Sequence, residues 1–155
     1  MNEQSSSRNC FVCGVENPAG LHLHFYESDT DPVQVTADYI VPRKYQGYPG
    51  IVHGGILATM LDEVTSRTVF RGDNPRLVVT AQLSVRYRKP VPVETPIKLI
   101  GQIVEDKGKV IKVTGKISDT AGTTLAEADA VLVEVAPDFM GEPRDENDWN
   151  IYPER

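Results

Sequence analysis

The chain has 155 residues, a mass of 17.1 kDa, a mean hydropathy of −0.29 and a formal net charge of −6. A chain of this size and composition is expected to form one soluble globular domain that needs neither disulfides nor a metal for its stability. No apolar run approaches the ~20 residues that span a bilayer, and residues 1–8 are polar. We therefore expect a cytoplasmic protein with no membrane partner.

The negative charge is concentrated at the C-terminal end. Residues 137–155 hold six acidic and two basic side chains, a balance of −4, which leaves −2 for residues 1–136. A nearly neutral body is not attracted to a phosphate backbone, so we expect no nucleic-acid partner. The acidic tail is either an arm that packs on a neighbouring subunit or a loosely ordered extension, and we favour the second.

The N-terminal part predicts a lead-in followed by a hairpin. Residues 1–9 are expected to be disordered, within a lead-in segment of residues 1–19. In Leu21–Tyr26 and again in Val33–Tyr39, apolar residues alternate with the others, which is the period of a half-buried strand. The turn between these two strands is expected at Ser28–Pro32.

A single long helix is predicted next. After a loop rich in Pro and Gly, the apolar residues Leu57, Met60, Leu61 and Val64 recur at helical spacing. We expect a helix over Gly54–Phe70, about 25 Å long at the usual rise per residue.

Four strands are predicted after the helix, at Leu77–Tyr87, Ile97–Val104, Val110–Ile117 and Thr124–Val135. Short turns between them indicate antiparallel neighbours. The last strand is apolar at both parities, so we expect a central strand covered on both faces. This element order predicts an α+β domain over residues 20–136, an antiparallel sheet wrapped around one central helix, whose open edges favour pairing between chains.

The segment His53-Gly54-Gly55 stands at the predicted start of the helix. Backbone N–H groups in a first helical turn have no partner within the helix, and the dipole is positive there, so an oxygen with negative charge is stabilised. Glycine lets a ligand approach that backbone closely. The alternative is a flexible helix entry without a ligand.

Asp62 lies roughly 140° from the centre of the apolar stripe on a helical projection. A mid-helix Asp is usually a solvated surface residue. Its neighbours on this face are small, which suits the close approach of another helix: Ala58, Thr59, Thr65 and Ser66. Glu63 lies on the other flank and is expected at the surface or in a structural ion pair.

Residues 50–55 (Gly-Ile-Val-His-Gly-Gly), with Asp62 nine residues after His53, resemble the hotdog-fold acyl-CoA thioesterases, the phenylacetyl-CoA and 4-hydroxybenzoyl-CoA thioesterase-like group. The resemblance implies a homodimer, often paired into a homotetramer, that hydrolyses acyl-CoA without metal or cofactor. It matches Gly54 to the glycine whose N–H binds the thioester oxygen, Asp62 to the catalytic carboxylate and Ser66 to a hydroxyl that holds the attacking water. Gln46 stands one position before the family's usual amide residue and is a substitute for it.

The spacing supports a site between two subunits. Eight residues separate Gly54 from Asp62, or ~12 Å of helix rise, so the carboxylate cannot reach a carbonyl held at its own helix start. Two antiparallel helices across a twofold axis would bring each Asp62 to the other chain's Gly54. Asp62 is expected to act as base or as nucleophile, and His53, beside Gly55, to fix the loop and polarise the carbonyl.

Basic residues near the end of the first strand after the helix are candidates for the phosphates of coenzyme A: Arg86, Arg88 and Lys89. Thr80 and Ser84 are candidates for the pantetheine or acyl slot. Solvated surface is the alternative for each of the five.

Two other functions keep the same fold: an acyl-CoA sensor without hydrolysis, and a hydratase or dehydratase that moves a proton to carbon. The acid nine residues after His53 favours hydrolysis over both.

Cys10 and Cys13 form a Cys-x-x-Cys pair, and His22 and His24 follow on one face of the first predicted strand. Two thiols and two imidazoles could bind zinc. A single pair of cysteines is a weak signal, so we favour two packed reduced thiols and no metal site.

Overall fold

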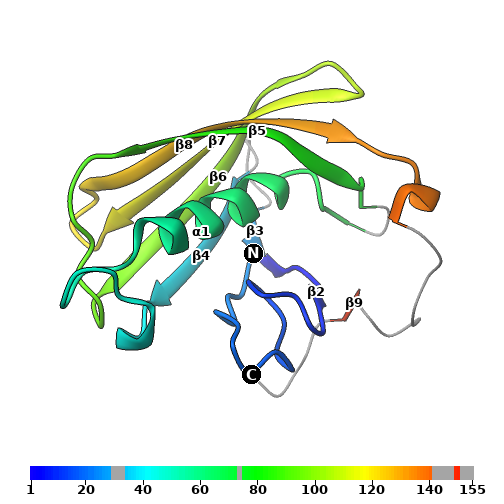
Figure 1. The fold of residues 1–155 in the computed structure, drawn as a ribbon. Helices are drawn as coiled ribbons and strands as arrows, with labels where there is room; N and C mark the ends of the chain where they lie inside the picture. Colours follow the sequence, from blue (N-terminus) through cyan, green and yellow to red (C-terminus); the bar gives the residue numbers. More distant parts are fainter. Residues whose placement is uncertain (29–33, 73–74, 141–148, 151–155) are drawn as a thin grey trace.

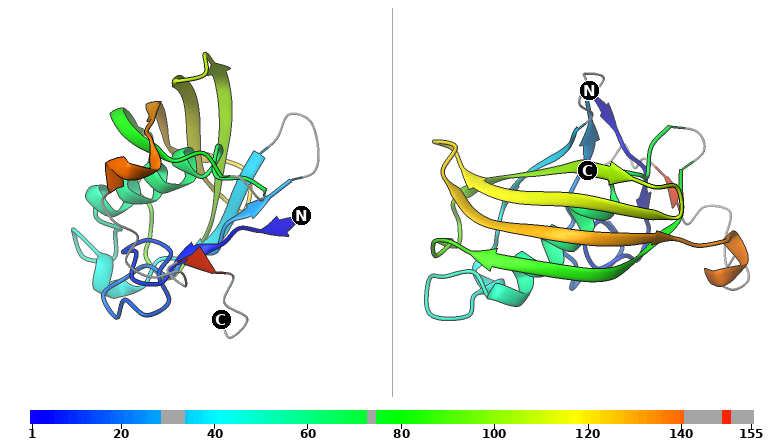
Figure 2. Two further views of the ribbon diagram at one scale, coloured as in Figure 1. Left: turned by 90° about the vertical axis from the view of Figure 1, so that its right-hand side faces the viewer. Right: turned by 90° about the horizontal axis from the view of Figure 1, so that it is seen from above.

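The computed structural model describes residues 1–28, 34–72, 75–140 and 149–150. One helix, α1 (Gly54–Ser66), is covered by an antiparallel sheet that curves around it (Figures 1 and 2). The sheet has the order β1-β3-β4-β6-β7-β8-β5. Its strands are β1 (Asn2–Glu3), β3 (Tyr26–Glu27), β4 (Gln34–Ile40), β5 (Val78–Tyr87), β6 (Pro96–Asp106), β7 (Val110–Asp119) and β8 (Thr124–Glu134).

The remaining elements are short. Strand β2 (Ser6–Ser7) pairs with β9 (Trp149–Asn150) in a separate two-stranded sheet, and two 3-10 helices, η1 and η2, span Arg43–Tyr45 and Pro137–Met140. No helix in the described ranges is long and apolar enough to cross a membrane. The cytoplasmic location and the domain bounds 1–19, 20–136 and 137–155 stay predictions.

The four strands predicted after the helix are confirmed within two residues at every end. Antiparallel hairpins join β6 to β7 and β7 to β8. Gly108 and Gly122 lie in their turns with φ of +79° and +84°, a conformation that glycine adopts without a steric cost.

The strand predicted at Leu21–Tyr26 is wrong over most of its length, because only Tyr26–Glu27 pairs as β3. Its alternation does describe burial, since Leu21, Leu23 and Phe25 are buried. The backbone N–H groups of Leu21 and Leu23 bond to carbonyls of the N-terminal segment instead of a neighbouring strand.

The expected disorder of residues 1–9 is also wrong. β1 pairs with β3, and Gln4 is buried with its amide nitrogen donating to the carbonyls of Arg67 and Phe70. β3 in turn pairs with β4 as the predicted hairpin requires. The turn predicted at Ser28–Pro32 falls, after Ser28, on residues outside the described ranges, as do residues 141–148 and 151–155 of the acidic tail.

The helix ends at Ser66 and not at Phe70 as predicted. The hydroxyl groups of Thr65, Ser66 and Thr68 each donate to the carbonyl three residues earlier. After Ser66 the backbone changes from α-helical to 3-10 hydrogen bonding: the N–H groups of residues 68, 69 and 70 each donate to the carbonyl three residues earlier. Such local bonds compete with the α-helical ladder and close it.

Strand β8 is an interior strand, as expected, but this chain covers only one of its faces. Ala126, Ala128 and Ala130 are buried on the side of the helix. On the other side Glu127 is half-buried and Asp129 is exposed. The expectation of cover on both faces is therefore wrong for a single chain, because one helix covers only the concave side.

Two glycines set how closely α1 approaches the sheet. Gly101 on β6 faces Gly115 on β7 in the strand register. A Cβ at Gly101 would lie 2.3 Å from the carbonyl oxygen of Val64, and one at Gly115 would lie 2.9 Å from a methyl of Thr65. At Gly101 the backbone of the helix therefore packs directly on the backbone of the sheet, with no side chain between them.

Gly101→Ala is expected to destabilise the fold by about 3 kcal/mol, since the helix backbone itself would have to move. The matched variant Gly115→Ala meets a side chain and is expected to cost about 1 kcal/mol. Urea unfolding followed by circular dichroism measures both values. Equal stability of the two variants would contradict the close backbone contact.

Candidate active site

The start of α1 is held by the side chain of His53. His53 occupies the N-cap position with φ −61° and ψ 134°, and its Nδ1 accepts the Gly55 N–H at 2.9 Å. Because Nδ1 accepts, a neutral ring carries its proton on Nε2. The imidazole thus caps the helix start, and within the described ranges no group bonds to its Nε2.

The N–H of Gly54 is the free donor of this helix start. The N–H groups of Ile56 and Leu57 bond to the His53 carbonyl, and that of Gly55 bonds to the His53 ring. Within the described part of the chain, no group accepts from Gly54 N–H. This donor lies at the positive end of the helix dipole. Gly54 is the glycine that the resemblance matched to oxygen binding, and the N–H of Gly55, the other glycine of the predicted site, is used by the cap.

A hollow of about 460 Å³ opens at this helix start. Its walls are Gly47, Tyr48, Ile51, Val52, His53 and Gly54. Backbone bonds hold the loop that forms it, because His53 N–H donates to Tyr45 O at 3.0 Å and Val52 N–H to Val91 O at 2.8 Å. Gly54, whose N–H has no acceptor among the described residues, is thus one of the residues that line the hollow.

Gln46 is built into the loop and does not line the hollow. Its Oε1 accepts the N–H of Gly50 at 3.0 Å, and its backbone forms a bridge with Val52. The structure thus shows a loop-bracing contact for Gln46, and its expected contact with substrate stays a prediction.

Tyr87 is a residue of this region that the sequence reasoning missed. Its hydroxyl donates to the Gly54 carbonyl at 2.9 Å, and its ring lies 3.5 Å from the position that a Cβ on Gly54 would take. Tyr87 stands at the end of β5, and only the packing of β5 beside the helix start brings it there. A tyrosine next to Arg86 and Arg88 carries no sequence signal of such a contact.

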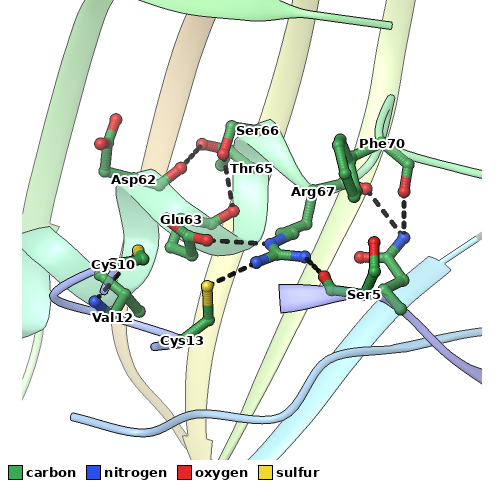
Figure 3. A network of polar contacts seen from close by, with 11 residues as sticks. Ser5, Cys10, Val12, Cys13, Asp62, Glu63, Thr65, Ser66, Arg67 and Phe70 are labelled. Carbon is green, nitrogen blue, oxygen red and sulfur yellow. Dashed lines mark hydrogen bonds and ion pairs between the residues drawn. The ribbon is translucent and has the colours of Figure 1, made fainter. Parts of the chain in front are cut away.

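Asp62 lies on the opposite half of α1 from the hollow, eight residues along the helix. Its side chain is half-buried, and no described group bonds to its carboxylate. Figure 3 shows this carboxylate pointing away from the cysteines on the other flank. The hydroxyl of Ser66 donates to the Glu63 carbonyl at 2.9 Å, so its oxygen keeps the ability to accept a bond. At ~12 Å of helix rise from Gly54, Asp62 does not complete a site within its own chain.

The residues predicted to bind substrate lie along and beyond β5. Ser84 and Arg86 stand opposite Asp129 and Glu127 in the register, on the outer face of the sheet. Thr80 is half-buried beside a bulge, and Lys89 is exposed.

Acidic neighbours hold both arginines. Arg86 lies 3.2 Å from Asp129, and Arg88 donates to Glu127 at 2.6 Å, which together with Arg86 lowers the pKa of Glu127. The structure does not bring these side chains to Gly54, so their binding roles stay predictions.

The cysteines meet α1 and not the predicted histidines. His22 bonds to the carbonyl of Asn17, and His24 Nδ1 lies 2.8 Å from Glu3 Oε1. The zinc set of two thiols and two imidazoles, which we did not favour, is therefore not formed by the described residues. Cys10 and Cys13 lie instead beside Glu63, with the three polar atoms within 4.8 Å of one another.

Arg67 places a permanent positive charge in this group, which we call the cysteine–arginine cluster (Cys10, Cys13, Glu63 and Arg67; Figure 3). Its guanidinium donates to Cys13 Sγ at 2.8 Å and to Glu63 Oε1 at 2.9 Å. Glu63 is thus the ion-pair partner that the sequence suggested. The cluster does not fit a metal ion, because the protein supplies its own cation there.

Comparison with known proteins gives a consistent picture. The family model of the thioesterase superfamily matches residues 49–126. The acyl-coenzyme A thioesterase THEM4 of Rattus norvegicus is 33% identical over 137 residues, which are 88% of this chain and 58% of that protein. The chain thus spans less than two thirds of this relative. The chain is also 29% identical to a protein of Candida albicans that is described as mitochondrial and uncharacterized. That match covers 65% of this chain and 48% of the Candida protein.

Solved structures share the fold. A crystal structure of a thioesterase superfamily protein has a TM-score of 0.73 and 30% identity, covering 81% of this chain and 63% of the other. A protein of Streptococcus mutans, solved with acetyl-CoA, has a TM-score of 0.64 and 20% identity, covering 72% of this chain and 89% of the other. The second likeness concerns the fold alone.

The cap predicts a stability difference between two variants of His53. His53→Ala removes the acceptor for Gly55 N–H and is expected to cost about 1 kcal/mol of unfolding free energy. His53→Asn supplies a side-chain oxygen at the same position and is expected to keep most of it. Chemical unfolding of both proteins checks this, and a His53→Asn protein as unstable as His53→Ala would refute the cap.

Proposed function

Because the chain belongs to the thioesterase superfamily, we propose that it hydrolyses acyl-CoA thioesters to a free acid and coenzyme A. The observation that carries the proposal is the Gly54 N–H, which has no acceptor in the described structure and stands at the positive end of α1. An N–H in that position stabilises an oxygen on which negative charge develops. The name of the THEM4 relative supports the same substrate class.

In the proposed reaction, the thioester carbonyl oxygen accepts the Gly54 N–H inside the hollow. Attack on the carbonyl carbon moves charge onto that oxygen, and the intermediate collapses to release the coenzyme A thiolate. One such donor typically contributes ~3 kcal/mol to the transition state. Because His53 Nδ1 accepts from Gly55, the other ring nitrogen of His53 is the proposed second donor toward the carbonyl, and the Tyr87 hydroxyl donates to the Gly54 carbonyl.

The attacking group in this proposal is a water activated by Asp62 of a second copy of the chain, or that carboxylate itself. Asp62 is half-buried, and no described group bonds to its carboxylate; Ser66 lies one turn further on the same face with an oxygen able to accept from the water. The helix length keeps Asp62 from its own Gly54. Two antiparallel α1 helices related by a twofold axis would pair each Asp62 with the other Gly54.

An edge strand supports the proposed homodimer. β5 is the last strand of the sheet, and one side of it has no partner strand among the described residues. Such an edge presents unpaired N–H and carbonyl groups to a second chain. Further pairing of dimers into a homotetramer is part of the proposal.

Gly54→Pro is expected to lower kcat/KM for acyl-CoA about a hundredfold or more, because it removes only the proposed donor. Proline fits the first position of a helix, and the extended His53 suits a following proline. The matched control Gly54→Ala keeps the N–H, and its Cβ meets Tyr87 at an ordinary 3.5 Å. Thiol release from aryl, short and long acyl-CoA measures activity. Equal loss in both variants would remove the oxyanion role.

Asp62→Asn is expected to abolish thiol release, whereas Asp38→Asn, on the outer face of β4, is expected to leave it unchanged. Mixing Asp62→Asn with Gly54→Pro through unfolding and refolding tests the intersubunit site. Each mixed dimer holds one intact pair of residues, so a random mixture should recover about a quarter of wild-type activity. No recovery in a mixture shown to contain mixed dimers would contradict a site shared between chains.

Binding and hydration measurements on the wild type distinguish hydrolysis from the two other functions. Acyl-CoA binding without thiol release in the wild type would identify a sensor. Hydration of an enoyl-CoA, seen as loss of its double-bond absorbance, would identify a hydratase.

A further inference from the structure

The cysteine–arginine cluster lies outside the proposed thioesterase site and contains both cysteines of the chain. Cys10 is partly exposed and Cys13 is buried. In Figure 3 the two thiols stand on one flank of α1, and the Asp62 carboxylate points away from them. An accessible thiol next to a buried one is the arrangement of a dithiol in which one sulfur attacks and the other resolves.

We propose that Cys10 and Cys13 are a redox modification site, a dithiol that closes reversibly to an intramolecular disulfide with Cys10 as the attacking sulfur. The reaction uses no residue of the thioesterase site, so the two proposals stand or fall separately.

The backbone between the cysteines already has the curvature that a disulfide needs. Residues 11–13 form a turn, and the Gly14 N–H bonds to the Cys10 carbonyl at 2.9 Å. A Cβ at Gly14 would lie 2.4 Å from Cys10 N, so this closed turn requires glycine. This turn brings the sulfur atoms of Cys10 and Cys13 within 4.8 Å of each other, and a disulfide joins its two sulfurs at about 2.05 Å. Closure therefore needs side-chain rotation and little backbone movement.

Hydrogen bonds make Cys10 the reactive sulfur. The Val12 N–H points at Cys10 Sγ from 3.3 Å. The Cys13 thiol donates to the same sulfur, and this bond is the main reason that the pKa of Cys10 is lowered to about 6. At neutral pH the thiolate, which is the nucleophilic form, therefore predominates at Cys10.

Arg67 favours the second step of disulfide formation, in which Cys13 attacks the sulfur of Cys10. Burial and the donated proton raise the pKa of Cys13, whereas the Arg67 guanidinium at 2.8 Å lowers it. Arg67 is 2% exposed and is held by Glu63 and by the Ser5 carbonyl. Once Cys10 is bound to another sulfur, Cys13 no longer has a thiolate to donate to. Its own thiolate then forms beside a fixed positive charge.

The chemistry requires a low-molecular-weight disulfide as the oxidant. The Cys10 thiolate attacks one of its sulfurs, forms a mixed disulfide and releases one thiolate. Cys13 then gives up its proton and attacks the Cys10 sulfur, which releases the second thiolate. The protein loses two electrons and its sulfurs join, while the small disulfide is reduced to two thiols. Excess thiol reverses both steps.

To test the proposal, the 155-residue chain is incubated with oxidised glutathione at neutral pH, and its intact mass is measured without reductant. The wild type should end two hydrogens lighter and carry no glutathione. Cys13→Ser should stop with one glutathione attached. Cys10→Ser should react at least about tenfold more slowly than the wild type, because its remaining thiol, Cys13, is buried. Alkylation of the wild type should reach half of its plateau rate near pH 6.

Two results would overturn the proposal. One is a wild type that keeps a stable glutathione adduct or does not react at all. The other is a Cys10→Ser protein, shown by circular dichroism to be folded, that is modified as fast as Cys13→Ser. Because the wild-type measurement needs no substitution, it decides the matter even if a variant fails to fold.

Discussion

The contact between α1 and the concave face of the sheet is the constraint on which the rest of the structure depends. The helix buries Leu57, Met60, Leu61 and Val64 against strands that would otherwise expose an apolar face. At Gly101 the helix backbone comes so close that no side chain fits between them. Such a contact fixes the rotation and the position of the helix along the sheet, because packed interiors deform little. Both ends of α1 are placed by it.

The first end carries the proposed oxygen-binding donor, and the last end carries the attachment of the N-terminal segment. At the first end the His53 cap uses the N–H of Gly55, and no described group accepts from the N–H of Gly54. At the last end Arg67 reaches the N-terminal segment through the Ser5 carbonyl and Cys13, with its charge balanced by Glu63. A buried arginine is stable only with such partners. The segment expected to be disordered is thus ordered by a helix residue far from it in sequence.

The face of α1 that carries Asp62 and Ser66 is the face that we propose contacts a second copy of the chain. Asp62 and Ser66 are half-buried and polar, and among the described residues no group bonds to the Asp62 carboxylate. One edge of β5 likewise has no partner strand in the described part of the chain. A helix face and a strand edge that are both incomplete in one chain fit the proposal that the working unit contains two.

The sequence by itself determined the elements whose signal is local. A period of two predicted the strands after the helix, and the spacing from Leu57 to Val64 predicted α1, because each pattern reflects burial on one side of a short segment. The sequence His53-Gly54-Gly55 marked the start of α1. Tertiary structure decided what depends on distant partners. Residues 21–25 pair with a loop rather than a strand, Tyr87 reaches Gly54, and the thiols meet Arg67 instead of His22 and His24. Hydrogen bonds between segments far apart in the chain leave no period in either segment, so only the packed fold could show them.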